Sequence, residues 1–314
     1  MQFGLHLPAS SDSVTSQDLV RFARRAEDLG FYCITVADHI IVPKHISVPY
    51  PYTADGKYPG AGYHLETLTT IGFLAGATHR IRFVTSVMIA PYRNPVITAK
   101  MLASLDVLSG GRIIVGLGVG WMKEEFENLK TPPYRERGRV TDEYICAFRE
   151  LWTQDNPSFQ GKYCSFSDII FLPKPVQKPI PIWIGGHSRQ ALRRAGQLGD
   201  GWHPIGGVPS IPLEPEDVKR DLETLRGFAQ AAGRNPDAIR VAFKGSLYDR
   251  EKQAVAGKRR RFVGVNDEIV GDIQDYRDAG VDTLIFDVRR PSATETLERM
   301  EWLAQEVIGK VENS

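Results

Sequence analysis

The sequence predicts an α/β fold, the (β/α)8 or TIM barrel, in which eight parallel strands alternate with helices. Eight short apolar, β-prone runs, amphipathic segments between them, and a spacing broken at only two places support this prediction. The predicted strands are residues 3–7, 33–37, 81–87, 113–118, 180–184, 201–204, 239–243 and 282–288. The predicted helices are 18–29, 65–78, 97–108, 139–152, 189–195, 216–232, 268–279 and 294–307. A doubly wound open sheet is the competing fold, but eight regular repeats favour closure.

Two insertions interrupt this alternation. Residues 40–63, after strand 2, are rich in Pro and Tyr, and residues 156–178, before strand 5, predict a short hairpin (FQGKYCSFSDIIF) and a Pro-rich return. Insertions in a barrel commonly shape its active site. No linker or shift in composition marks a second domain, so we expect one domain over residues 1–314.

Composition is that of a soluble globular protein, with 42% apolar and 25% charged residues. A net charge of +1 argues against a nucleic-acid partner. No apolar run reaches the roughly 20 residues of a membrane span, and the opening MQFGLHLP does not resemble a signal peptide. Three cysteines without CxxC spacing predict neither disulfides nor zinc. We therefore expect a cytoplasmic protein with a small-molecule partner.

A glycine pair follows the predicted fifth strand. Gly185 and Gly186 let the chain turn, His187 comes next, and Ser188 is a good N-cap for the following helix. Free backbone N–H groups at such a helix start form a seat for an anion. The alternative is an ordinary loop in which the glycines serve geometry alone.

A second glycine-rich segment, GLGVGW, ends the predicted fourth strand at residues 116–121. It fails the dinucleotide-binding fingerprint, because Trp121 replaces the third glycine and the motif lies in the middle of the chain. Glycines here would let a planar ring approach the backbone, with Trp121 as a wall. Close packing of a glycine-rich strand end is the alternative.

Histidines gather at the predicted mouth of the barrel, where active sites of this fold form. His6, His39, His187 and His203 end strands 1, 2, 5 and 6, while His45 and His64 lie in the first insertion. For His6 and His203, a packed structural role is an equal alternative. Asp38 and His39 are the strongest catalytic candidates, because a carboxylate beside an imidazole can hold or exchange a proton.

Other chemistries lack their motifs. There is no HxH on strand 1, no HExxH and no GxSxG, so neither a metal site nor a serine nucleophile is predicted. Lys244, at the end of strand 7, is the lysine placed to form a Schiff base, but it has no identifiable partner. The basic run from Lys258 to Arg261 predicts a solvated face, with contact to an acidic cofactor tail as the alternative.

Several segments, in a characteristic order and spacing, resemble one family. They are FGLHLP, ADH at residues 37–39, RIRFVTSVMIAPYRNP, SGGRIIVGLGVGWMKEEF, FQGKYCSF, PKPVQKPIPIWIGGHS, LGDGW and FVGVNDEIVGDIQDYRDAGVDTLIF. The chain resembles the bacterial luciferase-like monooxygenase superfamily, specifically its deazaflavin (coenzyme F-420)-dependent oxidoreductase branch. The resemblance covers nearly the whole length.

This resemblance implies a barrel whose mouth holds a flavin or deazaflavin beside the substrate. It places His39 next to the reactive ring carbon and a non-prolyl cis peptide, Ser86-Val87, behind the ring. The implied cofactor contacts are Ser86, Val87, Gly118, Val119, Gly120 and Trp121, with Gly185, Gly186, His187 and Ser188 at the phosphate end. A sugar-phosphate dehydrogenase of this branch has a catalytic glutamate where this chain has Trp121, so that activity is not expected.

We therefore expect an F-420-dependent oxidoreductase that transfers a hydride between the cofactor and a small organic substrate. His39 and Asp38 are its predicted catalytic residues, and a homodimer is its expected assembly. One alternative is an FMN-dependent, luciferase-like monooxygenase that uses O2. Others are a non-catalytic flavin-binding protein and an unrelated phosphate-handling barrel.

Overall fold

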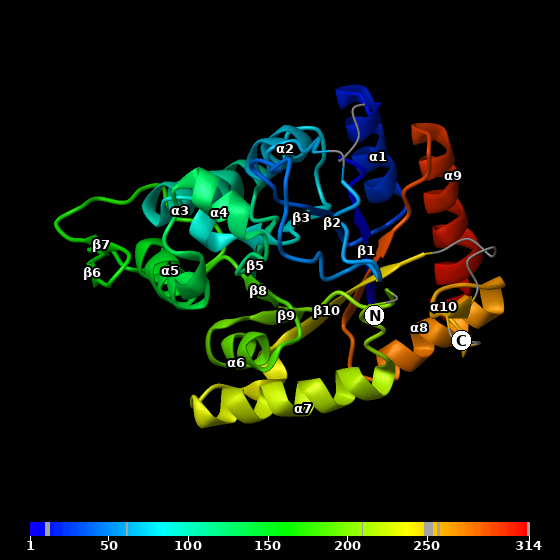
Figure 1. Ribbon diagram of the computed structural model, residues 1–314. Coiled ribbons are helices and arrows are strands. Elements are labelled where there is room, and N and C mark those ends of the chain that lie inside the picture. Colours follow the sequence, from blue (N-terminus) through cyan, green and yellow to red (C-terminus); the bar gives the residue numbers. More distant parts are fainter. Residues whose placement is uncertain (10–12, 61, 209, 248–253, 256–257, 313–314) are drawn as a thin grey trace.

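The computed structural model describes residues 1–9, 13–60, 62–208, 210–247, 254–255 and 258–312, and its centre is a closed parallel barrel (Figure 1). The eight barrel strands are β1 (Gln2–His6), β2 (Cys33–Val36), β3 (Arg82–Thr85), β5 (Ile113–Gly118), β8 (Ile182–Gly185), β9 (Gly201–His203), β10 (Arg240–Ser246) and β13 (Thr283–Asp287). Hydrogen bonds join them in the order β3-β2-β1-β13-β10-β9-β8-β5, and β5 pairs back with β3. That last pairing closes the sheet, which confirms the predicted barrel and excludes the open sheet.

Helices surround the barrel and follow its strands. They are α1 (Ser16–Asp28), α2 (Thr67–Ala75), α3 (Pro95–Ser109), α5 (Arg137–Thr153), α6 (Arg189–Leu198), α7 (Pro215–Ala231), α8 (Asn266–Asp278) and α9 (Ala293–Trp302). A π-helical turn (Leu303–Ile308) and α10 (Gly309–Glu312) extend the last helix. The short helix α4 (Lys123–Leu129), between β5 and α5, was not predicted.

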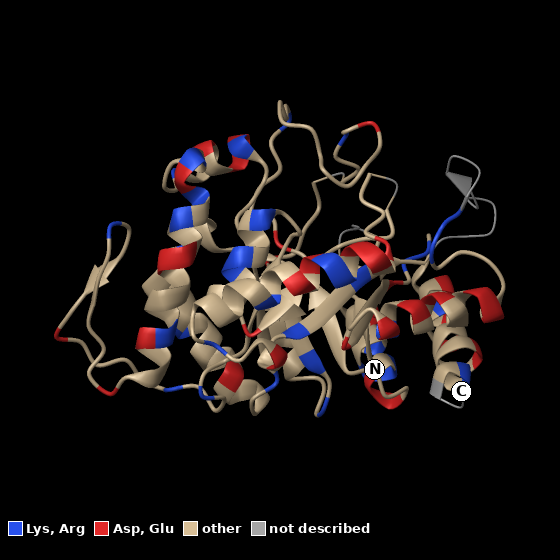
Figure 2. Ribbon diagram, turned by 90° about the horizontal axis from the view of Figure 1, so that it is seen from below, with Lys and Arg blue, Asp and Glu red and all other residues tan. Residues whose placement is uncertain are grey.

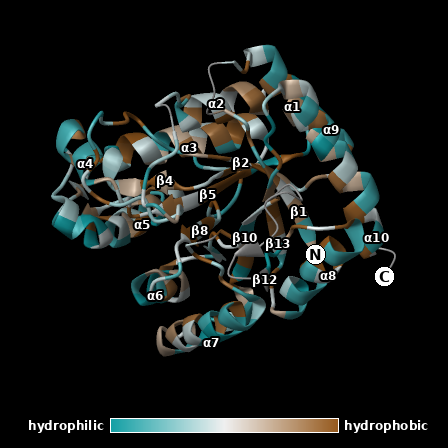
Figure 3. Cartoon of the chain, turned by 45° about the vertical axis from the view of Figure 1, so that its right-hand side comes forward, coloured by the Kyte–Doolittle hydropathy of each residue, from teal (hydrophilic) through white to brown (hydrophobic). Residues whose placement is uncertain are grey.

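The strands are buried on both faces, as their nearly continuous apolar runs require. Leu5, Phe83, Val115 and Leu284 each have no exposed surface. Figure 3 shows the hydrophobic colour concentrated on the strands and on the inner faces of the helices, with hydrophilic residues outside. Burial of apolar side chains between barrel and helices is therefore the main stabilising interaction.

The two insertions lie where the sequence places them. In the second, β6 (Phe159–Gln160) pairs antiparallel with β7 (Ser165–Phe166), which confirms the predicted hairpin. The first insertion, residues 40–63, forms no helix or strand among its described residues and packs against α4. There Glu124 accepts hydrogen bonds from the backbone N–H and the hydroxyl of Ser47.

Charged residues lie mainly on the outer elements, and Figure 2 shows both signs interspersed along the helices. A further strand pair, β11 (Ala254–Val255) and β12 (Lys258–Arg259), follows β10. None of the helices in the described ranges is long and apolar enough to cross a membrane.

The closing strand β5 needs a glycine at position 116. A Cβ built on Gly116 would lie 2.0 Å from the carbonyl oxygen of Thr85, and that backbone atom cannot rotate away. The Thr85 hydroxyl also donates to the Gly116 carbonyl at 2.7 Å, so β3 and β5 are held closely at this point.

We therefore predict that Gly116→Ala lowers the free energy of unfolding by about 3 kcal/mol or prevents folding, because the added methyl group overpacks the barrel wall. Gly227→Ala is the control, since a Cβ at Gly227 in α7 meets nothing within 4 Å. It should leave stability unchanged or raise it by up to about 1 kcal/mol. Denaturant unfolding measures both, and equal stability of the two variants would contradict this account of β5.

Candidate active site

A cavity of about 640 Å³ opens at the carboxyl ends of the strands. This volume is typical of a small-molecule site. The sequence-predicted residues that line it are Asp38, His39, Ser86, Val87, Gly118, Val119, Gly120, Trp121, Gly185 and Gly186. The first insertion forms much of the remaining wall. The structure therefore brings most of the predicted site into one cavity.

One wall of the cavity is apolar and carries no charged group. The Ser86-Val87 peptide is cis, as predicted, and both residues line the cavity. A Cβ on Gly118 would lie 2.5 Å from Val87 Cγ2, and one on Gly185 would lie 2.9 Å from Val87 Cγ1. The two glycines thus make room for Val87, and the three residues form a smooth surface, here called the Val87 wall.

Only the first part of the loop after β8 lines the cavity. Gly186, with φ of +92°, lines the cavity and its carbonyl accepts a 2.7 Å hydrogen bond from Trp202 Nε1. Ser188 is the N-cap of α6, as predicted, and its hydroxyl accepts from the Ala191 N–H at 3.2 Å. His187 and Ser188 do not line the cavity, so their role at a phosphate end remains a prediction.

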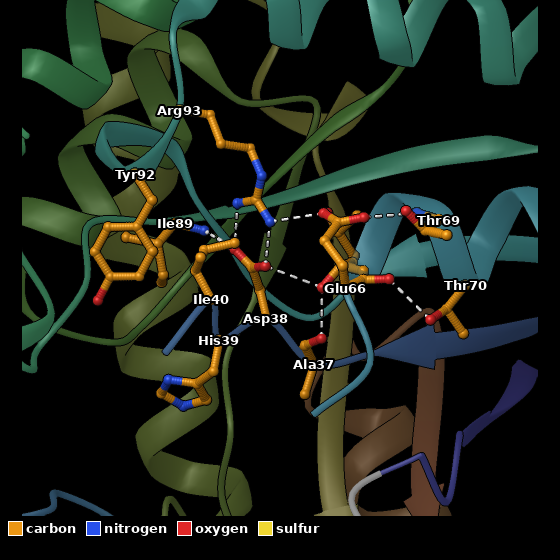
Figure 4. A network of polar contacts seen from close by, with 12 residues as sticks. Ala37, Asp38, His39, Ile40, Glu66, Thr69, Thr70, Ile89, Tyr92 and Arg93 are labelled. Carbon is orange, nitrogen blue, oxygen red and sulfur yellow. Dashed lines mark hydrogen bonds and ion pairs between the residues drawn. The ribbon is translucent and has the colours of Figure 1, made fainter. Parts of the chain in front are cut away.

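The Asp38 carboxylate is buried and faces away from His39 (Figure 4). Arg93 donates to both of its oxygens, at 2.8 and 2.6 Å, and the Ile89 N–H donates at 2.9 Å. Arg93 also donates to Glu66, at 2.9 Å. Asp38 therefore joins the ends of β2 and β4 (Met88–Ile89) to the start of α2, and it is not the proton partner of His39 expected from their adjacency.

The partner of the His39 imidazole is Glu125, on the unpredicted helix α4. Their Nδ1 and Oε2 atoms are 3.0 Å apart, and the Glu125 side chain has no exposed surface. Tyr92 donates to the same oxygen at 2.9 Å, while the N–H groups of Ile40 and Ile41 donate to the other at 2.8 and 3.2 Å. Because the phenol and both amides donate to this carboxylate, it acts as the acceptor and His39 Nδ1 as the donor. The pKa of Tyr92 is raised, mainly because the phenol is buried and also because it lies beside the Glu125 carboxylate.

Nothing in the local sequence pointed to this pair. His39 and Glu125 are 86 residues apart in the chain. The one available signal was Glu125 itself, a carboxylate inside the motif that follows GLGVGW, on a segment too short to show helical periodicity. Only the folded arrangement brings it beside the imidazole.

Aromatic side chains of the first insertion cover the cavity. Tyr50 and Tyr58 lie against Trp121, with ring centroids 5.1 and 5.9 Å apart. His64 lies 4.9 Å from the His39 ring, and the Tyr58 hydroxyl is 2.7 Å from His64 Nε2. Burial lowers the pKa of His64 to about 4, so this imidazole is neutral at pH 7. Trp121 thus forms part of the cavity lining, against these aromatic side chains, as the predicted wall.

Polar groups line the side of the cavity across from the Val87 wall. Lys244, inside β10, places its Nζ 3.1 Å from His6 Nδ1. The Thr35 hydroxyl lies 2.9 Å from the same nitrogen. Asp287 and Arg289 form an ion pair at 2.5 Å, and Arg289 lines the cavity. Lys244 and His6 therefore belong to the site, although neither was predicted as a catalytic or cofactor-binding residue.

The remaining candidates lie outside the cavity. His203 is buried behind Ser86, 3.0 Å from its hydroxyl, and burial lowers the pKa of His203 to about 4. His45 is exposed. Arg259 is exposed and Arg261 partly exposed, as a solvated face requires, and both also pair with the buried Asp272, at 2.6 and 2.9 Å. The Lys258 side chain lies outside the described part of the structure, within which no three metal-ligating side chains cluster.

Comparisons with known proteins agree with this architecture. The family model described as luciferase-like monooxygenase matches residues 1–279. An uncharacterized protein of Mycobacterium tuberculosis is 33% identical over 296 residues, which cover 93% of this chain and 95% of the relative. The solved structure of a monooxygenase from Streptomyces bottropensis superposes with a TM-score of 0.79 at 22% identity, covering 99% of each chain.

Two further relatives have names that specify a cofactor. The F-420-dependent glucose-6-phosphate dehydrogenase of Amycolatopsis mediterranei is 28% identical over 315 residues, covering 88% of this chain and 90% of the relative. The FMNH2-dependent dimethylsulfone monooxygenase of Pseudomonas putida is 33% identical over 200 residues, covering 63% and 52%. The family match over most of the length, together with the barrel and its mouth, establishes that this chain belongs to the luciferase-like monooxygenase family.

Proposed function

We propose that this protein is a deazaflavin (F-420)-dependent oxidoreductase in which His39 exchanges the proton that accompanies hydride transfer to or from a small organic substrate. The observation that carries this proposal is the pairing of His39 with the buried Glu125 in a cavity that is also lined by the uncharged Val87 wall. The F-420-dependent relative, similar over most of the chain, supports the choice of cofactor.

The Val87 wall fits a planar ring system. Val87, Gly118 and Gly185 present a methyl surface and bare backbone to the cavity, because no Cβ fits on either glycine. Gly120, at φ of +83°, extends the same surface toward Trp121. A flat apolar wall favours a stacked ring over a flexible or charged group. When bound there, a deazaflavin supplies hydride transfer to or from a substrate carbon.

His39 is arranged to handle the proton. Because Nδ1–H is directed to Glu125, the neutral imidazole has its lone pair on Nε2, which has no hydrogen-bond partner among the described residues. Nε2 accepts a proton from a substrate hydroxyl when a hydride leaves the adjoining carbon, and the imidazolium returns a proton in the reverse direction. Glu125 fixes the tautomer, so we assign it a positioning role.

An FMN-dependent monooxygenase is the second candidate function. It is favoured by the relative from Pseudomonas putida, whose name specifies dependence on FMNH2. The Val87 wall accommodates either ring, so the choice between them depends on measured affinity.

Titration of the purified protein with F-420 and with FMN tests the cofactor. We expect F-420 to bind at least tenfold more tightly, a difference of about 1.4 kcal/mol. The readout is the change in fluorescence of each cofactor. Equal midpoints, or a purified protein that holds stoichiometric FMN, would favour the monooxygenase.

His39→Ala tests the proton-transfer role. With a substrate found by screening secondary alcohols, enones and other activated alkenes, turnover should fall about 10²-fold while the dissociation constant of F-420 changes little. His45→Ala, at an exposed histidine of the adjoining first insertion, is the matched control and should retain turnover. A loss confined to cofactor affinity would show that His39 only contacts the ring.

Glu125→Gln tests the positioning role without a substrate. Nitrogen chemical shifts of His39 should report the Nδ1–H tautomer in the wild-type protein, and a mixture of tautomers in the variant, because the amide introduced there can donate as well as accept. Turnover should fall about tenfold or more. Glu127→Gln, at an exposed carboxylate of the same helix, is the control. An unchanged tautomer in Glu125→Gln would refute the role assigned to Glu125.

A further inference from the structure

The cavity has two chemically different halves that face each other across the barrel. In the ring β1-β2-β3-β5-β8-β9-β10-β13, each strand has one strand opposite it. β3, β5 and β8 end in the Val87 wall, and the strands opposite them are β10, β13 and β1 in turn. Those three strands carry Lys244, Asp287 and His6, and Arg289 follows β13. The half opposite the uncharged wall is therefore the polar one.

The Lys244 ammonium of this polar half lacks a directly paired carboxylate among the described residues. The Asp287 carboxylate is paired with the Arg289 guanidinium at 2.5 Å, and the pKa of Asp287 is lowered by that pair although burial opposes it. Lys244 forms no ion pair with a carboxylate in the described ranges, and its nearest polar partner is His6 Nδ1 at 3.1 Å. Lys244 is thus attracted by the Asp287 carboxylate, which is already paired with Arg289, and has no carboxylate within ion-pair distance in the described part of the chain.

His6 carries no negative charge that could balance the Lys244 ammonium, and it is not a second cation beside Lys244. Burial, followed by the neighbouring Lys244, lowers the pKa of His6 well below its usual value, so the imidazole is neutral at pH 7. Burial lowers the pKa of Lys244 to about 8, which leaves the ammonium form predominant at pH 7. Asp287 offsets only part of this effect of burial. A partly desolvated ammonium without a direct ion-pair partner is stabilised when an anion binds beside it.

Aromatic groups of the first insertion lie near Arg289, in the same cavity as Lys244. Tyr50 and Tyr58 line the same cavity, and Arg289 is close enough to lower the pKa of both phenols, although burial raises it overall. The cavity thus combines the Lys244 ammonium, which has no carboxylate within ion-pair distance in the described ranges, with the apolar faces of these rings. It suits a molecule with a carboxylate at one end and an apolar, planar body.

We propose that Lys244, assisted by His6 and Arg289, binds a carboxylate or similar oxyanion of the substrate, and that the tyrosines of the first insertion hold its apolar part. This inference rests on the proposed function only in taking the bound molecule to be the substrate. The cofactor ring is assigned to the opposite half, so Lys244 selects the substrate and is not a cofactor residue.

Calorimetric titration at pH 6.5, with cofactor-free protein, tests the inference with three matched pairs: acetate and acetamide, benzoate and benzamide, cinnamate and cinnamamide. Each pair differs in charge with nearly the same shape. We expect the carboxylate of at least one aromatic pair to bind tenfold or more tightly than its amide. Lys244→Met should abolish that preference, Lys244→Arg should retain it, and Lys219→Met, at an exposed lysine of α7, should leave it intact.

The same variants separate this inference from the proposed function. Lys244→Met should bind F-420 as the wild-type protein does, because its ammonium is on the substrate side. Absence of a carboxylate preference in all three pairs, or its survival in a folded Lys244→Met, overturns the inference. So does a loss of F-420 affinity in that variant, which would assign Lys244 to the cofactor. If F-420 fails to bind the wild-type protein while the carboxylate preference holds, the proposed cofactor is wrong and the anion site stands.

Discussion

The buried ion pair between Asp38 and Arg93 is the contact on which the mouth of the barrel depends. It uses both carboxylate oxygens and also engages the Ile89 N–H, so the end of β2 is fixed to the segment that follows the Ser86-Val87 peptide. Removing one partner of a buried pair of this kind costs about 3–5 kcal/mol, because the other charge is left without compensation. The positions of Val87 and His39 both follow from this contact.

A second buried carboxylate, Glu125, completes the mouth from the other side. It accepts hydrogen bonds from Ile40 and Ile41 at the start of the first insertion, and from His39 and Tyr92 beside the cavity. The insertion and the imidazole are therefore held by the same group. Because Glu125 binds both, the first insertion and the His39 imidazole cannot shift independently without breaking a hydrogen bond to this carboxylate.

Closure of the barrel separates the charges of the site. Because β3, β5 and β8 lie opposite β10, β13 and β1, glycines and Val87 gather on one side, while Lys244 and the Asp287–Arg289 pair gather on the other. In the function that we propose, this separation brings the cofactor ring on the uncharged surface face to face with a substrate held by its polar end. The Val87 wall and the polar half belong to different strands. The residues of the polar half can therefore vary between proteins of this fold while the Val87 wall stays the same.

The barrel, its two insertions and the glycine-rich ends of β5 and β8 were predictable from the sequence, because alternating apolar runs and glycines act over a few neighbouring residues. The family resemblance added the cis Ser86-Val87 peptide, which the structure contains. The carboxylate that serves His39 was not predictable in this way. Successive residues at a strand end point to opposite sides, so Asp38 turns to Arg93 while His39 turns to Glu125, 86 residues away. The same holds for Lys244 and His6: their proximity arises from the closed ring of strands, which no local pattern encodes.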